Sequence, residues 1–534
     1  MQTLVAVPGD IKHYILQFIS DPRDLYNLIL TCKELRAVAL PFYYNTVYVH
    51  GNLALPVLAA GLVPTNPGLQ HVRHLVIKEP YGYNAVDYVP GACDSRTDII
   101  LTFLANLLPH DRLLTFTCDC DVSLSSPILA TLYRRQHKLR TLRLDSVDLE
   151  PLITSFSRDS LANVATAHIS TADPEEASSW NRLLPTLSSL RNLEVAASTD
   201  RSDETSPLTA DQSSKSQYEL HLHALQVQGF DLTDAAPILR RSVHFPELKV
   251  LGMQLGENSV RLLEVLYETH ELESQNLRTL IIVEAEKIPA SRAYSPALSR
   301  VLGTFSTLEH LIVRTKSNSA YWSDFGAVAG HAASLRLLHL DCPTPRPLPQ
   351  GVKRGSGSII ELRKLEQITL PMSNIVLAEA DCCATAGCYK DMHYILHANL
   401  STQLILDALP SLRTFQILGM RLGDLNVQQI DRQVLRAYAL RQMRTLADYV
   451  FNALTNLKVL SLERYVYRNP DTGRRESYSG QCYHRGKTID AVGREQATAI
   501  EASLRELKRI EPAVDILGME DLEHGGLFRH GYDL

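Results

Sequence analysis

The sequence predicts an α/β protein in which a short cluster of helices at the N-terminus precedes an irregular, horseshoe-shaped solenoid of repeats. Two observations predict this architecture. Residues 7–44 carry apolar side chains at helical spacing, and behind them a six-residue apolar pattern occurs thirteen times. The chain has 534 residues, of which 45% are hydrophobic, and this is enough for one elongated repeat array or for several separate domains.

The first two helices of the N-terminal cluster have clear start signals. The first is predicted to begin after Asp10. Its apolar face consists of Ile11, Ile15, Phe18 and Ile19. The second is predicted to have Ser20 or Asp21 as its N-cap, with Pro22 in the first turn, where the missing N–H costs nothing. Its apolar face consists of Leu25, Leu28, Ile29 and Cys32.

A third helical piece completes the cluster. It is predicted from Lys33 to Val38, and Pro41 is expected to end it because proline has no N–H to donate. We therefore expect three regions along the chain. These are a helical domain at 1–50, a repeat solenoid at 51–463, and a C-terminal loop with a capping helix at 464–534.

A frame of the form apolar-x-x-apolar-x-apolar recurs through the predicted solenoid. Each frame predicts a short strand whose alternate side chains point into a core. Frames that begin at Leu113, Leu139, Val164 and Leu190 are 25 or 26 residues apart, within the leucine-rich-repeat period of about 20–29 residues. Because one repeat cannot bury its own apolar face, neighbouring repeats must stack. The thirteen frames begin at Val72, Leu113, Leu139, Val164, Leu190, Leu222, Leu248, Leu277, Leu308, Leu335, Leu365, Leu412 and Leu457.

The asparagine that usually follows the strand of a leucine-rich repeat is absent from nearly every frame. Asp145 follows Leu144, for example, and Asp341 follows Leu340. A ladder of buried asparagine side chains is therefore missing. We expect an irregular rather than a regular leucine-rich-repeat solenoid.

Longer interruptions of the pattern predict loops and additional helices. The Ser/Thr/Asp-rich segment 197–217 and the Pro/Gly-rich segment 342–358 predict exposed loops. An insert at 372–408 makes the step from Leu365 to Leu412 too long for one repeat. Helices are predicted at 259–272, 389–409, 434–454 and 494–510.

Composition and motifs argue against several classes of function. With 53 basic and 59 acidic residues the net charge is −6, so we expect no nucleic-acid partner. No apolar run reaches the roughly 18 residues that span a bilayer, so we expect no membrane partner. Nine scattered cysteines without a signal peptide favour a reducing compartment, the cytoplasm or the nucleus. No phosphate-binding glycine loop or nucleophile elbow is found, so we expect neither a cofactor nor enzymatic activity.

Potential metal ligands gather in the predicted insert. They are Cys382, Cys383, Cys388, His393 and His397. The two histidines are four residues apart and would share one helix face. The adjacent Cys382 and Cys383 cannot easily both point at one ion, which favours an insert with partly buried cysteines over a zinc site. The sequence leaves open whether these residues bind a metal, and we predict no metal site.

The side chains between the apolar positions of each frame are predicted to form a concave binding surface. Three of them, Ile281, Val283 and Ile312, would make an apolar patch. Its rim would consist of His310, Arg314, His339 and Asp341. Apolar residues with a charged rim are typical of a binding hot spot, so we predict that a protein substrate binds there. The alternatives are that a loop or the C-terminal tail covers this patch, or that its β-branched residues only favour strands.

Residues 7–44 resemble an F-box. The resemblance rests on Val7-Pro8-Gly9-Asp10, Ile15-Leu16, Asp21-Pro22-Arg23-Asp24-Leu25 and Thr31-Cys32-Lys33-Glu34-Leu35-Arg36. With the repeats, the chain is similar to F-box proteins with leucine-rich repeats of the fungal type. This resemblance implies a substrate-recognition subunit of a cullin-based, SCF-type ubiquitin ligase. The helices would bind a Skp-type adaptor through Pro8, Ile11, Ile15, Leu16, Pro22, Leu25 and Leu28.

A second interpretation is a non-catalytic leucine-rich-repeat scaffold. Repeat arrays need polar caps at their ends, and the N-terminal helices could serve only as such a cap. The residues of the cluster do not separate adaptor binding from capping, because some of them must pack the cluster itself.

Overall fold

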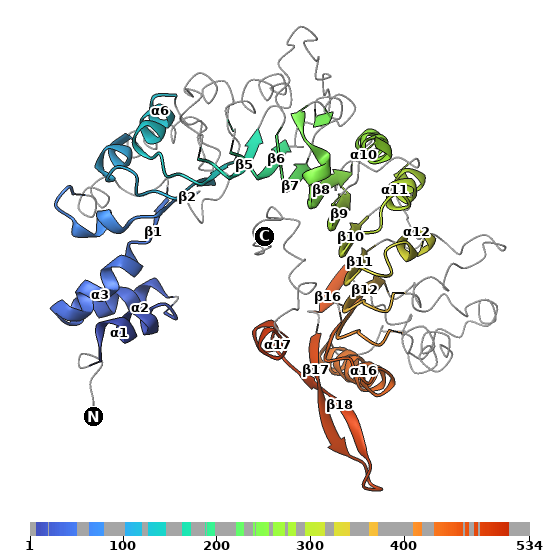
Figure 1. Cartoon of the computed structure of the whole chain (residues 1–534). Coiled ribbons are helices and arrows are strands. Elements are labelled where there is room, and N and C mark those ends of the chain that lie inside the picture. Colours follow the sequence, from blue (N-terminus) through green and yellow to red (C-terminus); the bar gives the residue numbers. More distant parts are fainter. Residues whose placement is uncertain are drawn as a thin grey trace. The chain divides into compact units, whose positions relative to one another are not determined.

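The structure, a computed structural model, forms two compact units, Met1–His244 (unit 1) and Phe245–Leu534 (unit 2) (Figure 1). The boundary lies inside the region that was predicted to be one solenoid. The structure describes residues 7–19, 21–50, 63–78, 102–119, 126–145, 163–171, 187, 189–197, 220–228, 239–240, 242–255, 260–272, 276–284, 294–315, 325–341, 362–371, 409–418, 432–462, 465–468, 475–478 and 481–511.

Unit 1 begins with three helices, α1 (Gly9–Leu16), α2 (Pro22–Thr31) and α3 (Lys33–Tyr43). Asp21 is the N-cap of α2, and its carboxylate accepts a hydrogen bond from the Arg23 N–H at 2.8 Å. This contact satisfies one of the free N–H groups at the start of the helix, with Pro22 in the first turn as predicted.

The prediction that Pro41 ends the third helix is wrong, because α3 continues to Tyr43. Proline breaks a helix mainly by removing one hydrogen bond and by crowding the preceding turn. Pro41 lies in the last turn, where the helix is about to end. The Tyr44 N–H still closes that turn on the Leu40 carbonyl at 3.0 Å.

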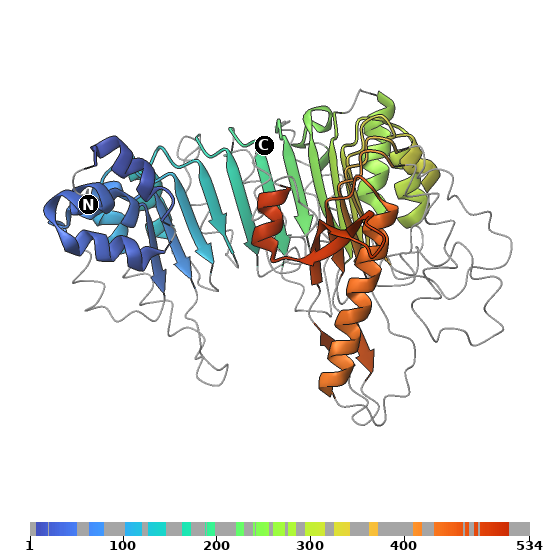
Figure 2. The ribbon, with the colours of Figure 1, turned by 90° about the horizontal axis from the view of Figure 1, so that it is seen from below.

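The rest of unit 1 is a parallel sheet in which each strand pairs with the next one along the chain (Figure 2). Its strands are β1 (Thr46–His50), β2 (His74–Lys78), β3 (Thr115–Asp119), β4 (Thr141–Leu144), β5 (Thr166–Thr171), β6 (Asn192–Ala197) and β7 (Ala224–Gln228). The 3₁₀ helix η2 (Pro67–His71) precedes β2, and α6 (Ser126–Arg135) precedes β4. Strand β1 follows α3 directly and carries none of the predicted frames.

Unit 2 continues the same design and then changes it at its C-terminal end. Its parallel strands are β8 (Val250–Leu255), β9 (Thr279–Glu284), β10 (His310–Arg314), β11 (Leu337–Asp341), β12 (Gln367–Pro371), β13 (Thr414–Leu418) and β14 (Val459–Leu462). An antiparallel hairpin, β17 (Gln481–Ile489) and β18 (Glu495–Glu501), extends the sheet from β14. A separate pair is formed by β15 (Tyr465–Arg468) and β16 (Arg475–Tyr478). The helices are α10 (Val260–Leu272), α11 (Tyr294–Leu302), α12 (Phe325–Ala329), α16 (Arg432–Ala453) and α17 (Leu504–Ile510).

All thirteen predicted frames form strands, β2 to β14, so the predicted α/β repeat fold is confirmed. In the frame that forms β9, for example, Leu280 and Ile282 of the strand and Leu277 just before it are almost completely buried. Alternation along a strand places these side chains in the core and the intervening ones on the opposite face. This opposite face is called the inner face, and in unit 2 it points away from α10, α11 and α12 (Figure 1).

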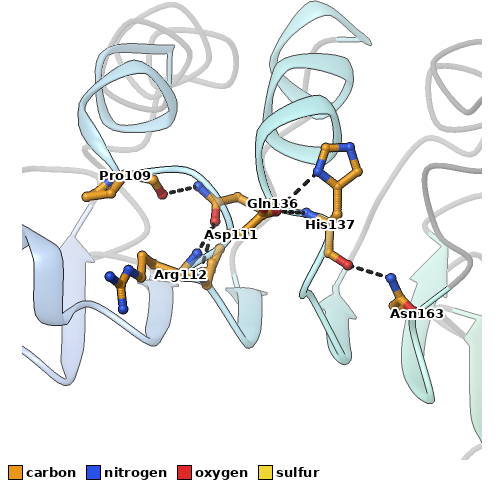
Figure 3. Close-up of polar contacts among 7 residues, drawn as sticks. Pro109, Asp111, Arg112, Gln136, His137 and Asn163 are labelled. Atoms are coloured by element: carbon orange, nitrogen blue, oxygen red, sulfur yellow. Dashed lines mark hydrogen bonds and ion pairs between the residues drawn. The ribbon is translucent and has the colours of Figure 1, made fainter.

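Polar contacts at the turns before the strands hold successive repeats together (Figure 3). The side chain of Gln136 is buried and donates a hydrogen bond to the Pro109 carbonyl at 2.9 Å. Asp111 accepts a hydrogen bond from the His137 N–H at 2.8 Å, and Asn163 donates one to the His137 carbonyl at 2.7 Å. Backbone groups of the turns are thereby paired by side chains without the asparagine ladder of a regular leucine-rich repeat.

The last strand of the unit 2 sheet is covered along its free edge by α16. The Asn452 side chain donates to the Ala497 carbonyl at 2.8 Å and accepts from the Ala497 N–H at 3.0 Å. Asp448 accepts a hydrogen bond from the Ala499 N–H at 2.6 Å. Two side chains of a helix therefore bind backbone groups that a further strand would otherwise pair with.

The C-terminal region differs from the predicted capping helix at 494–510. Residues 495–501 form β18, and the helix begins only at Leu504. The apolar spacing of this segment suits a strand as well as a helix, and pairing with β17 decides between them. The predicted helices at 259–272 and 434–454 are confirmed as α10 and α16.

Several predicted features lie outside the described residues. They are the loop at 197–217 except for Ala197, which ends β6, the loop at 342–358, and the insert at 372–408. The insert includes its predicted helix at 389–409, of which only Leu409 is described, and Cys382, Cys383, Cys388, His393 and His397. Among the described helices, none combines the length and the apolar character that a membrane span requires.

Candidate functional site

The structure divides the predicted adaptor-binding residues into two groups. Leu16 and Leu25 are buried together with Ala39 in the core of the helical cluster, and Leu28 packs against them. Pro8, Ile11, Ile15 and Pro22 are exposed. The first group holds the three helices together, and the second group is available for contact with another molecule.

An exposed apolar stripe runs along α1 and its C-terminal end. It consists of Ile11, Tyr14, Ile15 and Phe18. The spacing of these four residues places them on one side of the helix. Phe18 is 71% exposed, and its ring lies 5.1 Å from that of Tyr14 in an edge-on arrangement. Tyr26 and Leu30 of α2 are also exposed, so this cluster presents an unusual amount of apolar surface.

A lysine lies on the buried side of the same helix. Lys12 is only 7% exposed, and its ammonium group is 3.3 Å from Glu34 Oε2 of α3. Long lysine side chains can bury their methylene groups while the charged end finds a partner. Helix α1 therefore packs on its own domain through Leu16 and Lys12, and its larger aliphatic and aromatic stripe faces outward, whereas a helix that only packs on its own domain turns such a stripe inward.

The cluster joins the repeats through α3 and the strand that follows it. The Asn66 side chain, at the start of η2, donates a hydrogen bond to the Tyr44 hydroxyl at 3.0 Å. β1 then pairs with β2 and adds one strand to the sheet. The junction with the repeats is thus made by the end of α3, and the stripe of α1 remains exposed.

The inner face of unit 1 carries a charged network on three neighbouring strands. His168 of β5 lies between two carboxylates, with Nε2 2.6 Å from Asp145 Oδ1 and Nδ1 2.7 Å from Glu194 Oε2. Arg143 Nε lies 3.0 Å from Asp145 Oδ2. Burial by itself lowers the pKa of His168, but the two carboxylates raise that pKa above its usual value.

This network carries no recognisable sequence motif. Arg143, His168 and Glu194 occupy the same central position in three successive frames, and Asp145 follows the first of them. A search for complementary charges at equal positions of neighbouring frames would have found it, because the parallel register places such residues side by side.

The predicted substrate-binding residues lie together on the inner face of unit 2. The register of β9, β10 and β11 aligns Ile281, Ile312 and His339 in one row, and Val283, Arg314 and Asp341 in the next. His310 lies beside Thr279, in a third row. Arg314 Nε is 3.5 Å from Asp341 Oδ2, so the rim contains an ion pair.

The predicted exposure of this patch is wrong for its centre. Ile281 is 1% exposed and Ile312 is completely buried, while Val283 and the rim residues His310, Arg314 and Asp341 are half-buried. Ile281 and Ile312 form one hydrophobic cluster with Leu337, Val459 and Leu507. Leu507 belongs to α17, so the alternative in which the C-terminal tail covers the patch describes this structure.

The predicted rim residue His339 is also buried. It is 3% exposed, and burial followed by the nearby Arg314 charge lowers its pKa to about 3. His339 is therefore neutral at physiological pH. Among the described residues, neither of its ring nitrogens has a hydrogen-bond partner.

No family model and no curated protein matches the chain. Among solved structures, the chain is similar to one from the crystal structure of the Rad7 and Elc1 complex in yeast, with 14% sequence identity and a TM-score of 0.38. The match covers 77% of this chain and 86% of that one. A likeness at this level assigns no function.

Proposed function

We propose that this protein is a non-catalytic substrate-recognition subunit of an SCF-type ubiquitin ligase in the cytoplasm or the nucleus. Helices α1 and α2 bind a Skp-type adaptor that connects the chain to a cullin complex, and the repeats hold a protein substrate. Ubiquitin transfer is left to other subunits, and the chain contributes by keeping the substrate close to them.

The observation that carries this proposal is the orientation of α1. Its Ile11, Tyr14, Ile15 and Phe18 stripe faces outward, while Lys12 is buried against Glu34. Exposed aromatic and aliphatic side chains on a rigid helix are typical anchors of a protein interface. They lie within the segment whose sequence resembles an F-box, which supports an adaptor as the partner.

The alternative function is a repeat scaffold whose N-terminal helices only cap the solenoid. One observation favours it, namely that the Asn66–Tyr44 hydrogen bond ties the end of the cluster to the first repeat. A cap of this kind needs the buried residues Leu16 and Leu25 but not the exposed stripe. The two functions therefore differ in what the stripe does.

The test is the affinity of the full-length protein for a purified Skp-type adaptor. We expect the double variant Ile11→Asp/Ile15→Asp to bind at least about 30-fold more weakly, because loss of interface hot-spot residues typically costs about 2 kcal/mol or more. Ile489→Asp is the matched control, since Ile489 is 73% exposed on β17, outside the helical cluster. It should bind like the wild type.

Two results would contradict the proposal. Wild-type protein that is folded but does not bind the adaptor would favour the scaffold. Equal affinity of the wild type and the double variant would show that the stripe is not the docking surface. Circular dichroism of each variant checks that the substituted residues, which are exposed, leave the fold unchanged.

A further inference from the structure

The C-terminal helix α17 occupies the inner face of unit 2. Figure 1 shows it on the side of the sheet opposite to α10, α11 and α12. Its Leu507 is completely buried in the cluster with Ile281, Ile312 and Leu337. Ile281 and Ile312 belong to the surface that the sequence predicted to bind a substrate, so a segment of the chain itself packs where a partner was expected.

A second anchor lies at the end of the helix. The Glu511 N–H closes the last turn on the Leu507 carbonyl at 2.8 Å, so the two residues are one helical turn apart. Glu511 is 5% exposed, and its carboxylate accepts a hydrogen bond from Lys458 at 2.8 Å and lies 4.0 Å from Arg413. The inner face therefore offers an apolar cluster and, one helical turn further, two positive charges.

The fit between α17 and this face is incomplete. Both ring nitrogens of His339 and the hydroxyl of Thr414 are buried without a hydrogen-bond partner among the described residues. Buried polar groups in native proteins are almost always paired, and an unpaired one destabilises the state that contains it. The inner face of unit 2 thus carries buried polar groups that have no hydrogen-bond partner among the described residues, those of α17 included.

Helix α17 is also too short to be stable alone. It has seven residues, and isolated helices much shorter than about 12–15 residues are marginal in water. A capping box formed by Ser503 and Glu506 stabilises its first turn. The order of α17 therefore depends on its contact with the sheet, and a competitor that removes this contact releases the helix.

We propose that the inner face of β9–β14 binds an amphipathic helical segment of a protein partner, and that α17 occupies this site in cis. The partner segment carries an apolar residue in place of Leu507 and a carboxylate one turn later in place of Glu511. It also carries polar groups that reach His339 and Thr414, which lets it displace α17. This deepens the proposed function, because it names the face and the class of segment by which a substrate is held.

The test uses the full-length protein and a fluorescent peptide with the sequence of residues 502–512. In the wild type the tethered helix competes at an effective concentration on the order of millimolar, so the peptide should bind weakly. The variant Leu507→Asp expels α17 and leaves the site intact, and we expect it to bind the peptide at least about tenfold more tightly. Ile510→Asp is the matched control, because Ile510 lies on the same helix but is 41% exposed.

A second measurement reports directly on how accessible the inner face is to solvent. Carbethoxylation of His339, measured by mass spectrometry, should be slow in the wild type and in Ile510→Asp, and several-fold faster in Leu507→Asp. Should Leu507→Asp fail to fold, Glu511→Gln weakens the second anchor without placing a charge in the core and should show the same change to a smaller degree. A peptide with lysine in place of the residue that corresponds to Glu511 should bind weakly to every variant.

Equal peptide binding by the wild type and both anchor variants would overturn the inference, and so would a His339 that reacts equally fast in all of them. These measurements involve no adaptor. A failure of adaptor docking therefore leaves them unaffected, and their failure leaves the adaptor result standing.

Discussion

The inner faces of the two units each carry a histidine at the same position of the repeat, but the pKa values of the two histidines are shifted in opposite directions. His168 in unit 1 lies between the carboxylates of Asp145 and Glu194, and its pKa is raised. His339 in unit 2 is buried beside Ile312 with no hydrogen-bond partner in the described part of the chain, and its pKa is lowered to about 3. The two histidines have the same place in the backbone of the repeat, and side chains of the neighbouring strands determine whether each ring is charged.

This difference explains why only one of these faces presents an apolar row. A row of charged residues can pair within itself across parallel strands, as Arg143, Asp145, His168 and Glu194 do. A row that contains Ile281 and Ile312 exposes apolar surface until another segment covers it. Substitutions of the two histidines test whether the neighbouring strands set these opposite environments.

The largest effect is expected for His168→Leu. This substitution leaves Glu194, which is 1% exposed, as a buried carboxylate without its counter-charge. Breaking a buried ion pair by removing one partner typically costs about 3 kcal/mol or more. The expected result is a matching loss of hydrogen-exchange protection at the backbone amides of β4, β5 and β6.

The same substitution in unit 2 serves as the control. His339→Leu removes two unpaired buried nitrogens, so protection of β10, β11 and β12 should be unchanged or higher by about 1 kcal/mol. A large loss of protection at both sites would show that the two histidines are equivalent packing residues and that their opposite charge environments do not matter for stability.

The next largest effect is expected for the pH dependence of the folding stability of each unit. A histidine with a raised pKa stabilises the folded state fully below its ordinary value of 6.5, and this contribution is lost as the pH rises through the folded pKa. A histidine with a lowered pKa has the opposite effect. His339 destabilises the folded state as the pH falls below 6.5 toward about 3, because only the unfolded chain takes up the proton.

The change of stability with pH can be measured as hydrogen-exchange protection at several pH values between 5 and 8, for the wild type and for His168→Leu and His339→Leu. Each histidine can contribute at most about 1.4 kcal/mol per pH unit. We expect the His168 contribution to fall with rising pH and the His339 contribution to fall with decreasing pH. Slopes of equal sign would contradict the opposite environments of the two rings.

The smallest effect is expected at the rim of the unit 2 face. Arg314 and Asp341 are 3.5 Å apart, and their side chains are 15% and 38% exposed. Ion pairs with this degree of solvent contact contribute less than about 1 kcal/mol. Arg314→Gln should therefore change the protection of β10 and β11 only slightly, and a loss as large as that of His168→Leu would show that the rim belongs to the core.

Much of the fold could be predicted because the frame recurs at regular intervals. One frame is ambiguous, but thirteen in series require a common structure, and each of them forms a strand. The N-terminal helices were also predictable, because the cap at Asp21 and Pro22 is a local feature. What depends on spacing along the chain was therefore accessible from the sequence.

Two features could not be predicted in this way. They are the position of α17 on the inner face of unit 2, and which of the predicted adaptor-binding residues are buried and which are exposed. Ile312 lies in one buried hydrophobic cluster with Leu507, which is far away in the sequence and belongs to a helix rather than a strand. In α1, Ile11 and Ile15 are spaced like Lys12 and Leu16, so periodicity alone does not say which pair faces inward. Only the packing of α3, with Glu34 placed to receive Lys12, decides between them.

The α16 cover of β18 has a consequence for the protein in solution. An uncovered edge strand is a template on which a second chain can add its own strand, and this leads to polymers. Here Asn452 and Asp448 bind the outward backbone groups of Ala497 and Ala499, so those positions are closed to such growth. The sheet thus ends in an edge strand whose backbone groups at these positions are already paired, and this disfavours aggregation by edge-to-edge strand pairing.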